Sequence, residues 1–153
     1  MEAIIASAIA VLGTLLGSGI TLAVQRRTTE QGHEFTRGEK LRQERLDAYT
    51  AYAAALVNYR RCLVHLWICT HEQQREDPAV VKARSYDLRS SAEEALFRVQ
   101  MLTDGDSLGQ AGAALLAEIS DLHRADSRAD LDERRGRTRD DIRRLVKTAK
   151  QHL

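Results

Sequence analysis

The feature that most constrains this chain is an uncharged, apolar segment near its start. No Asp, Glu, Lys or Arg occurs from residue 3 to residue 24, where the sequence reads AIIASAIAVLGTLLGSGITLAV. A helix of this length rises about 33 Å, which matches the roughly 30 Å hydrocarbon core of a bilayer. The alternative is a buried core helix of a soluble protein, which we favour less because the segment has no polar face at any helical angle. We therefore predict a transmembrane helix over residues 3–24.

The charges that flank this segment predict its orientation. Arg26 and Arg27 follow it at once, whereas the other end carries only Glu2. Positive residues are retained in the cytoplasm, so we expect the N-terminus outside the plasma membrane and the body of the protein in the cytoplasm. A cleavable signal peptide has a basic start and a shorter apolar stretch, and this chain has neither feature. The sequence predicts a single-pass anchor.

Small residues recur along the predicted anchor at spacings of three and four. The series includes Ala6, Ala10, Gly13 and Gly17, which fall on one side of an ideal helix. Small residues let two helix backbones approach closely in lipid, so this ridge indicates self-association into a homo-oligomer. The alternative is that Ala and Gly are simply common in membrane spans. Because the segment contains no ionisable residue, we do not expect a proton relay or ion pathway within it.

A polar stem and a helical body follow the anchor. The stem, residues 25–45, alternates in charge and contains Gly32 and Gly38, which leaves an exposed helix and a hinge as alternatives. Over residues 46–153 the apolar spacing is helical and shows no useful period-2 alternation. Aromatic residues make up 5% of the chain and it has a single Pro, which argues against a sandwich or barrel. We predict an all-α protein whose cytoplasmic body is an antiparallel bundle of about four helices.

Caps and turns divide this body into helices. The first should run from Leu46 to near Thr70, and the second should begin after Asp77 as N-cap, with Pro78 at the first helical position. A turn is expected at residues 103–106. The apolar positions that we expect to face the core include Leu46, Tyr49, Tyr52, Leu56, Tyr59, Leu63, Leu66 and Trp67, then Val81, Leu88, Ala92, Ala95, Val99 and Leu102.

Two capping boxes mark the starts of the remaining helices. Ser107 with Gln110 predicts the start of the third helix, and Ser127 with Asp130 the start of the fourth. Their expected core positions are Leu108, Ala111, Leu115, Ile119 and Leu122, then Leu131, Thr138, Ile142, Leu145 and Ala149. The connections are short, so neighbouring helices should pack antiparallel.

The clearest candidate for chemistry is a set of cysteine and histidine residues, Cys62, His65, Cys69 and His71. These residue types ligate zinc, but Cys62 and Cys69 stand about 10 Å apart along a helix, too far to share one ion or form a disulfide easily. Buried cysteines that act as small hydrophobic residues are the favoured interpretation, and metal binding stays open. No phosphate loop, dinucleotide motif or HExxH sequence is present. We expect no enzyme activity, no cofactor and no metal.

The last twenty residues are strongly basic. Eight Arg or Lys and only two Asp occur from Arg134 to Leu153. Arg143, Arg144, Lys147 and Lys150 are candidates for contact with anionic lipid, because the predicted anchor holds this helix near the membrane. A solvated helix face is an alternative, and a membrane-tethered nucleic-acid-binding protein is another. Nucleic acid is the less favoured partner.

Three stretches of the chain resemble a known family. The anchor AVLGTLLGSGITLAVQRR, the body start LRQERLDAYTAYAAALVNYRR and the segment ALFRVQMLTD are similar to KilB-like proteins of actinobacteria, named for a plasmid spread protein of Streptomyces conjugative plasmids. The resemblance implies a membrane-associated accessory of intermycelial plasmid transfer or spread, with the DNA translocase as a separate protein. It also implies other membrane proteins of a transfer apparatus as a class of partner. From the sequence we therefore expect a single-pass, membrane-anchored helical interaction protein.

Overall fold

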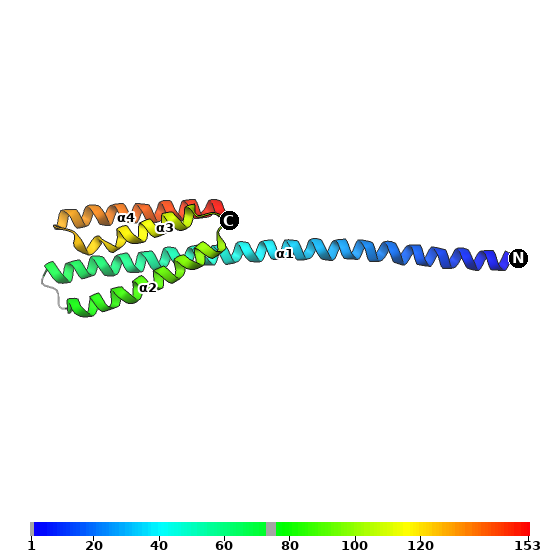
Figure 1. Ribbon diagram of the computed structural model, residues 1–153, viewed down its shortest axis with the longest axis horizontal. Helices are drawn as coiled ribbons and strands as arrows, with labels where there is room; N and C mark the ends of the chain where they lie inside the picture. The colour runs from blue at the N-terminus through cyan, green and yellow to red at the C-terminus, as the bar shows by residue number, and fades with distance from the viewer. Residues whose placement is uncertain (1, 73–75) are drawn as a thin grey trace. The chain divides into compact units, whose positions relative to one another are not determined.

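The chain is all-helical in a computed structural model (Figure 1). The structure describes residues 2–72 and 76–153, and the side chains of residues 37–72 and 76–153. The α-helices are α1 (Glu2–His71), α2 (Pro78–Leu102), α3 (Ser107–Ser120) and α4 (Arg128–Ala149), with short 3-10 turns η1 (Leu122–Arg124) and η2 (Lys150–His152). No strand occurs in these ranges, so the all-α prediction is confirmed. The predicted start of a separate body helix at Leu46 is wrong, because α1 runs through this position without a break.

The chain divides into two compact units, Met1–Leu41 and Arg42–Leu153. The first unit is part of α1. This helix continues through Gly32 and Gly38, so residues 25–45 are helical, which is one of the two alternatives that the sequence left open. In the second unit the remainder of α1 and helices α2, α3 and α4 lie side by side, each antiparallel to the next along the chain (Figure 1). Short connections enforce this up-and-down order.

The predicted anchor falls outside the part of the chain with described side chains. Within that part, no helix is long and apolar enough to cross a membrane. The segment 3–24, the small residues Ala6, Ala10, Gly13 and Gly17, and the flanking Arg26 and Arg27 all precede it. The transmembrane helix, its contact ridge and its orientation therefore stay predictions.

Every helix of the second unit contributes to one core. Among its fully buried side chains are Leu56 of α1, Val81 of α2, Ile119 of α3 and Leu131 of α4. The predicted apolar positions are mostly buried, but Leu46 is 43% exposed because the bundle core begins only at Ala48.

The buried face of α3 differs from the prediction. Ala111 is exposed, whereas Gly112 and Leu116 are buried. A Cβ atom on Gly112 would lie 2.9 Å from Tyr52 Cε1, and the Tyr52 hydroxyl donates a 2.8 Å hydrogen bond to the Gly112 carbonyl. The tyrosine ring thus occupies the space that a side chain on α3 would take, and this turns Gly112 rather than Ala111 toward α1.

The predicted start of α2 is confirmed, and the capping box predicted for α3 is wrong. Asp77 caps α2 by accepting a 2.8 Å hydrogen bond from the Ala79 N–H, and Pro78 is the first helical residue. At α3, Asp106 rather than Ser107 is the N-cap residue, and its side chain makes no capping hydrogen bond. The reason is Gly105, whose φ of +90° turns the chain into the helix one residue earlier than the Ser107–Gln110 pattern requires.

The start of α4 confirms half of its predicted capping box. The Ser127 hydroxyl accepts a 3.2 Å hydrogen bond from the Asp130 N–H, as an N-cap serine should. The Asp130 carboxylate accepts from the N–H of Asp126 at 3.0 Å, so the return bond of the box reaches one residue further back than predicted.

Candidate functional site

A groove of about 590 Å³ crosses the bundle between α1, α2, α3 and η1. Leu63 and Leu66 of α1 line it with buried apolar side chains, and Lys82 and Tyr86 contribute from α2. Arg124 of η1 also lines it. A groove lined by buried leucines and by charged residues suits an amphipathic helix or another extended peptide segment.

Some of the charged side chains that line this groove form ion pairs, and others do not. Arg89 pairs with Glu93 at 3.0 Å, and the hydrogen bond between them raises the pKa of Arg89. Arg124 pairs with Asp121 at 3.0 Å. Lys82 makes no ion pair with any residue whose side chain is described, so its ammonium group is available to an acidic partner.

A serine in the groove is held in a structural role. The Ser120 hydroxyl donates a 2.8 Å hydrogen bond to the Leu116 carbonyl and accepts one from the Tyr59 hydroxyl at 3.2 Å. These two bonds occupy the hydroxyl, and the His123 ring, which also lines the groove, lies 2.7 Å from the Ser120 carbonyl oxygen through Nδ1.

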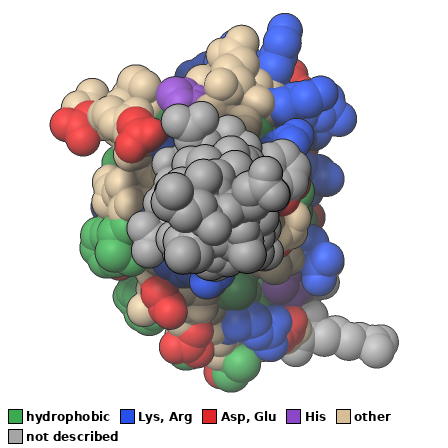
Figure 2. Space-filling view, turned by 90° about the vertical axis from the view of Figure 1, so that its right-hand side faces the viewer, with side chains coloured by type: hydrophobic (Ala, Val, Ile, Leu, Met, Phe, Trp, Pro, Cys, Tyr) green, Lys and Arg blue, Asp and Glu red, His purple; other side chains and the backbone are tan. Residues whose placement is uncertain are grey.

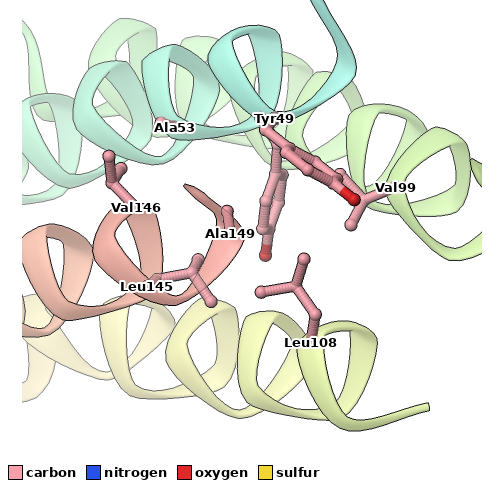
Figure 3. Close-up of a pocket in the computed structure, with 8 residues that line it drawn as sticks. Tyr49, Ala53, Val99, Leu108, Leu145, Val146 and Ala149 are labelled. Atoms are coloured by element: carbon pink, nitrogen blue, oxygen red, sulfur yellow. The ribbon is translucent and has the colours of Figure 1, made fainter. Parts of the chain in front are cut away.

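A second, smaller apolar hollow lies where α1, α2, α3 and α4 converge (Figure 3). Tyr49 reaches into it from α1, and Leu108 and Leu145 approach from α3 and α4. Its volume is only about 10 Å³, whereas ligand pockets measure roughly 300–1,000 Å³. The Tyr49 hydroxyl lies 3.1 Å from Thr103 Oγ1, which ties this end of the bundle to the α2–α3 turn. This hollow belongs to the core packing.

The four candidate metal ligands do not converge on one point. The Cys62 thiol donates to the Val81 carbonyl at 3.6 Å, and the His71 ring stacks on Trp67 with 4.4 Å between ring centroids. Only Cys69 and His65 touch, with 3.5 Å between Sγ and Nε2. Within residues whose side chains are described, no group of three or more His, Cys, Asp or Glu is placed to hold a metal ion.

The two cysteines are free thiols. Both Cys62 and Cys69 are buried and neither forms a disulfide. Burial is the main cause that raises the pKa of each thiol, which keeps it protonated at neutral pH. Because the thiolate is the reactive and metal-binding form, this arrangement matches the predicted role as small hydrophobic residues.

Glu76 is a polar link that the sequence reasoning missed. Its carboxylate accepts from Arg84 at 2.8 Å and lies 2.8 Å from His65 Nε2, so it connects α1 to the first turns of α2. Hydrogen bonds from His65, then from Arg84, lower the pKa of Glu76 below its ordinary value. Nothing in the stretch around Glu76 distinguishes it from other charged loop residues, so the sequence carried no signal for this contact.

Most arginines of the basic helix α4 are paired with nearby acids. Arg143 lies 3.2 Å from Asp140, and Arg144 pairs with Asp141. Lys147 and Lys150 make no ion pair with the residues whose side chains are described. On the face that Figure 2 presents, basic side chains gather mainly along the right-hand side, and most of the acidic ones lie at the left and below. Pairing lowers the charge that α4 offers to phosphates, so the anionic-surface role of these four residues stays a prediction.

Exposed apolar side chains gather on α2. Phe97 is 60% exposed and Met101 is 78% exposed, one helical turn apart. Tyr86 and Val80 are exposed on the same helix, and Tyr86 also lines the groove. Large apolar side chains in such positions are typical of contact surfaces when they cluster. Sequence reasoning missed Phe97 and Met101 because they fall between the core positions of α2.

Comparisons with known proteins give one match. A family model described as KilB plasmid transfer protein matches residues 46–153, which include the last part of α1 and all of α2, α3 and α4. Neither a curated protein nor a solved structure matches the chain.

Proposed function

The chain belongs to the KilB plasmid transfer protein family, and from this premise we propose that it is a membrane-anchored, non-catalytic accessory of intermycelial plasmid transfer. The family match is the observation that carries the proposal, because residues 46–153 include every residue of the bundle core. The sequence has no phosphate loop with which to drive DNA movement. The bundle would therefore act by binding the proteins that move the plasmid.

We propose that residues 3–24 anchor the chain in the plasma membrane, with membrane lipid as its first partner. The support is the absence of charge over 22 residues, followed at once by Arg26 and Arg27. An alkaline carbonate wash of cell membranes, with protease added outside intact spheroplasts, tests this directly. The anchor predicts that the protein stays in the pellet and that its body is protected. Release into the supernatant would contradict the anchor, and digestion of the body would contradict the orientation.

We propose that the small-residue ridge of the anchor supports a homo-oligomer. Gly13→Leu and Gly17→Leu place large side chains where close backbone approach is expected, so both variants should reduce crosslinked oligomers in mild detergent. Val11→Leu is the matched control, because the sequence pattern places residue 11 on the other side of the segment. Oligomers that are unchanged in both glycine variants would remove the ridge from the proposal.

We propose that other membrane proteins of the transfer apparatus bind the groove and the adjoining face of α2. Phe97→Asp and Met101→Asp change exposed apolar residues, so the fold should persist while plasmid transfer to recipient mycelium decreases. Ser91→Asp adds the same charge at another exposed position of α2 and serves as the control. Normal transfer by both apolar variants would exclude this face as the contact surface.

A further inference from the structure

Three arginines meet at a hollow between α1 and α4. Arg60 comes from α1, and Arg135 and Arg139 come from one face of α4, where Gly136 and Asp132 also line the hollow. Its volume is about 290 Å³. Apart from its chain neighbours and the backbone of α4 itself, no atom lies within 4 Å of the position that a Cβ on Gly136 would take, so no other part of the chain fills this part of the hollow.

Arg60 has no carboxylate partner among the residues whose side chains are described. Its Nη1 donates a 3.2 Å hydrogen bond to the Arg135 carbonyl, and its Nε is buried without a hydrogen-bond partner. Burial, followed by the charges of Arg135 and Arg139, lowers the pKa of Arg60. A partly buried guanidinium beside two others is unfavourable unless an anion approaches.

The acids near the hollow offset only part of this charge. Asp132 lies 3.9 Å from Arg135, but it also accepts a 3.3 Å hydrogen bond from Arg128. Asp140 lies 3.3 Å from Arg139 and also pairs with Arg143. Among the residues that line the hollow, three positive groups face a single negative one. The local excess of two positive charges matches a dianion.

We propose that this hollow binds a phosphate group in its dianionic form, either inorganic phosphate or a phosphomonoester. Arginine is suited to this ligand because its planar guanidinium donates paired hydrogen bonds to phosphate oxygens. A phosphodiester carries a single charge per phosphate and matches the excess less well. The site goes beyond the proposed role in plasmid transfer and does not depend on it.

The test is thermal unfolding of the full chain in non-ionic detergent, with inorganic phosphate replacing chloride at constant ionic strength and a pH of about 7.5. Specific binding should raise the Tm by on the order of 3 °C at a phosphate concentration near ten times the Kd. Arg135→Gln and Arg139→Gln change exposed side chains, so these variants should fold and lose most of the rise. Arg137→Gln on the same helix is the control and should keep it, because its partner Glu133 pairs with neither Arg135 nor Arg139.

Further arms distinguish the source of the phosphate and can overturn the proposal. Micelles that contain phosphatidic acid offer the phosphomonoester on a lipid. If the Tm rises in these micelles but not with inorganic phosphate, and the rise needs Arg135 and Arg139, the site binds lipid phosphate. An equal loss in Arg137→Gln would show general charge screening and refute the site. Binding of single-stranded DNA with no response to phosphate or phosphatidic acid would refute it too, as would no rise in any arm.

Discussion

At the scale of single residues, long side chains of α1 hold the bundle by hydrogen bonds to backbone carbonyls. The Trp67 indole N–H donates to the Ala125 carbonyl at 2.7 Å, and the indole is only 4% exposed. Trp67→Phe keeps an aromatic ring but removes the donor, which leaves a buried carbonyl without this partner. We expect the free energy of unfolding to fall by about 2 kcal/mol in urea titrations. Phe97→Leu changes an exposed aromatic residue, so its free energy of unfolding should fall far less. Equal losses of stability in both variants would contradict the argument.

Two helical glycines provide a matched pair at the same scale. A Cβ on Gly112 would lie 2.9 Å from both Leu96 Cδ1 and Tyr52 Cε1, whereas a Cβ on Gly136 would meet nothing within 4 Å. Gly112→Ala should therefore cost about 1–3 kcal/mol through overpacking. Gly136→Ala should stabilise the protein by up to about 1 kcal/mol, because alanine is the better helix former. The midpoints of urea unfolding test both signs, and shifts in the same direction would refute the distinction.

At the scale of the helical element, the ends of α3 and α4 give opposite predictions for two serines. Ser127 caps α4 through its hydroxyl, but Ser107 is already inside α3 and caps nothing. We expect Ser127→Ala to lower the free energy of unfolding by about 1 kcal/mol, with little change for Ser107→Ala. Thermal or urea unfolding of the two variants is sufficient. A loss in Ser107→Ala as large as that in Ser127→Ala would restore the capping box that the sequence predicted.

The connection between α1 and α2 should make stability depend on pH through Glu76. Its folded pKa lies below its ordinary value of 4.5, so the carboxylate contributes stability above that pH and loses it as the pH falls through the folded pKa. In Glu76→Gln we expect lower stability than wild type at neutral pH, with the difference shrinking below a pH of about 4.5. Urea titrations over this range measure it. Glu94→Gln removes an exposed carboxylate on α2 and is the control for the loss of one negative charge.

The sequence predicts those features of the helices that depend on neighbouring residues better than those that depend on residues far apart in the chain. Apolar spacing placed most of the buried positions of α2 and α4, such as Val81 and Ile142, because the helical period is local information. The start of α3 depended on Gly105, whose φ of +90° precedes an N-cap at Asp106 instead of Ser107. The buried face of the same helix depended on Tyr52, 60 residues away in sequence.

On the scale of the whole molecule, contacts between distant residues are what the sequence pattern could not supply. The bond from Arg60 to the Arg135 carbonyl spans 75 residues, and the contact of Arg45 with the His152 carbonyl spans 107. The sequence carries no signal for these two contacts, since neither arginine has its partner within one or two helical turns. The hollow at α1 and α4 therefore appears only when the bundle is assembled.

Arg45 also predicts where the independently folding unit begins. Its Nε donates to the Leu102 carbonyl at 2.7 Å, and its Nη2 lies 2.6 Å from Asp104, so one side chain ties α1 to the α2–α3 turn. The compact unit starts at Arg42, whereas the family match starts at residue 46 and therefore omits Arg45. We expect a fragment of residues 42–153 to unfold cooperatively and to be about 1–2 kcal/mol more stable than one of residues 46–153. Urea titrations monitored by circular dichroism compare the two fragments, and Arg45→Met in the longer one should reproduce most of the difference. If Arg45→Met kept full stability, the extra residues would stabilise the fragment only by lengthening the helix, and Arg45 would not contribute to the stability of the unit.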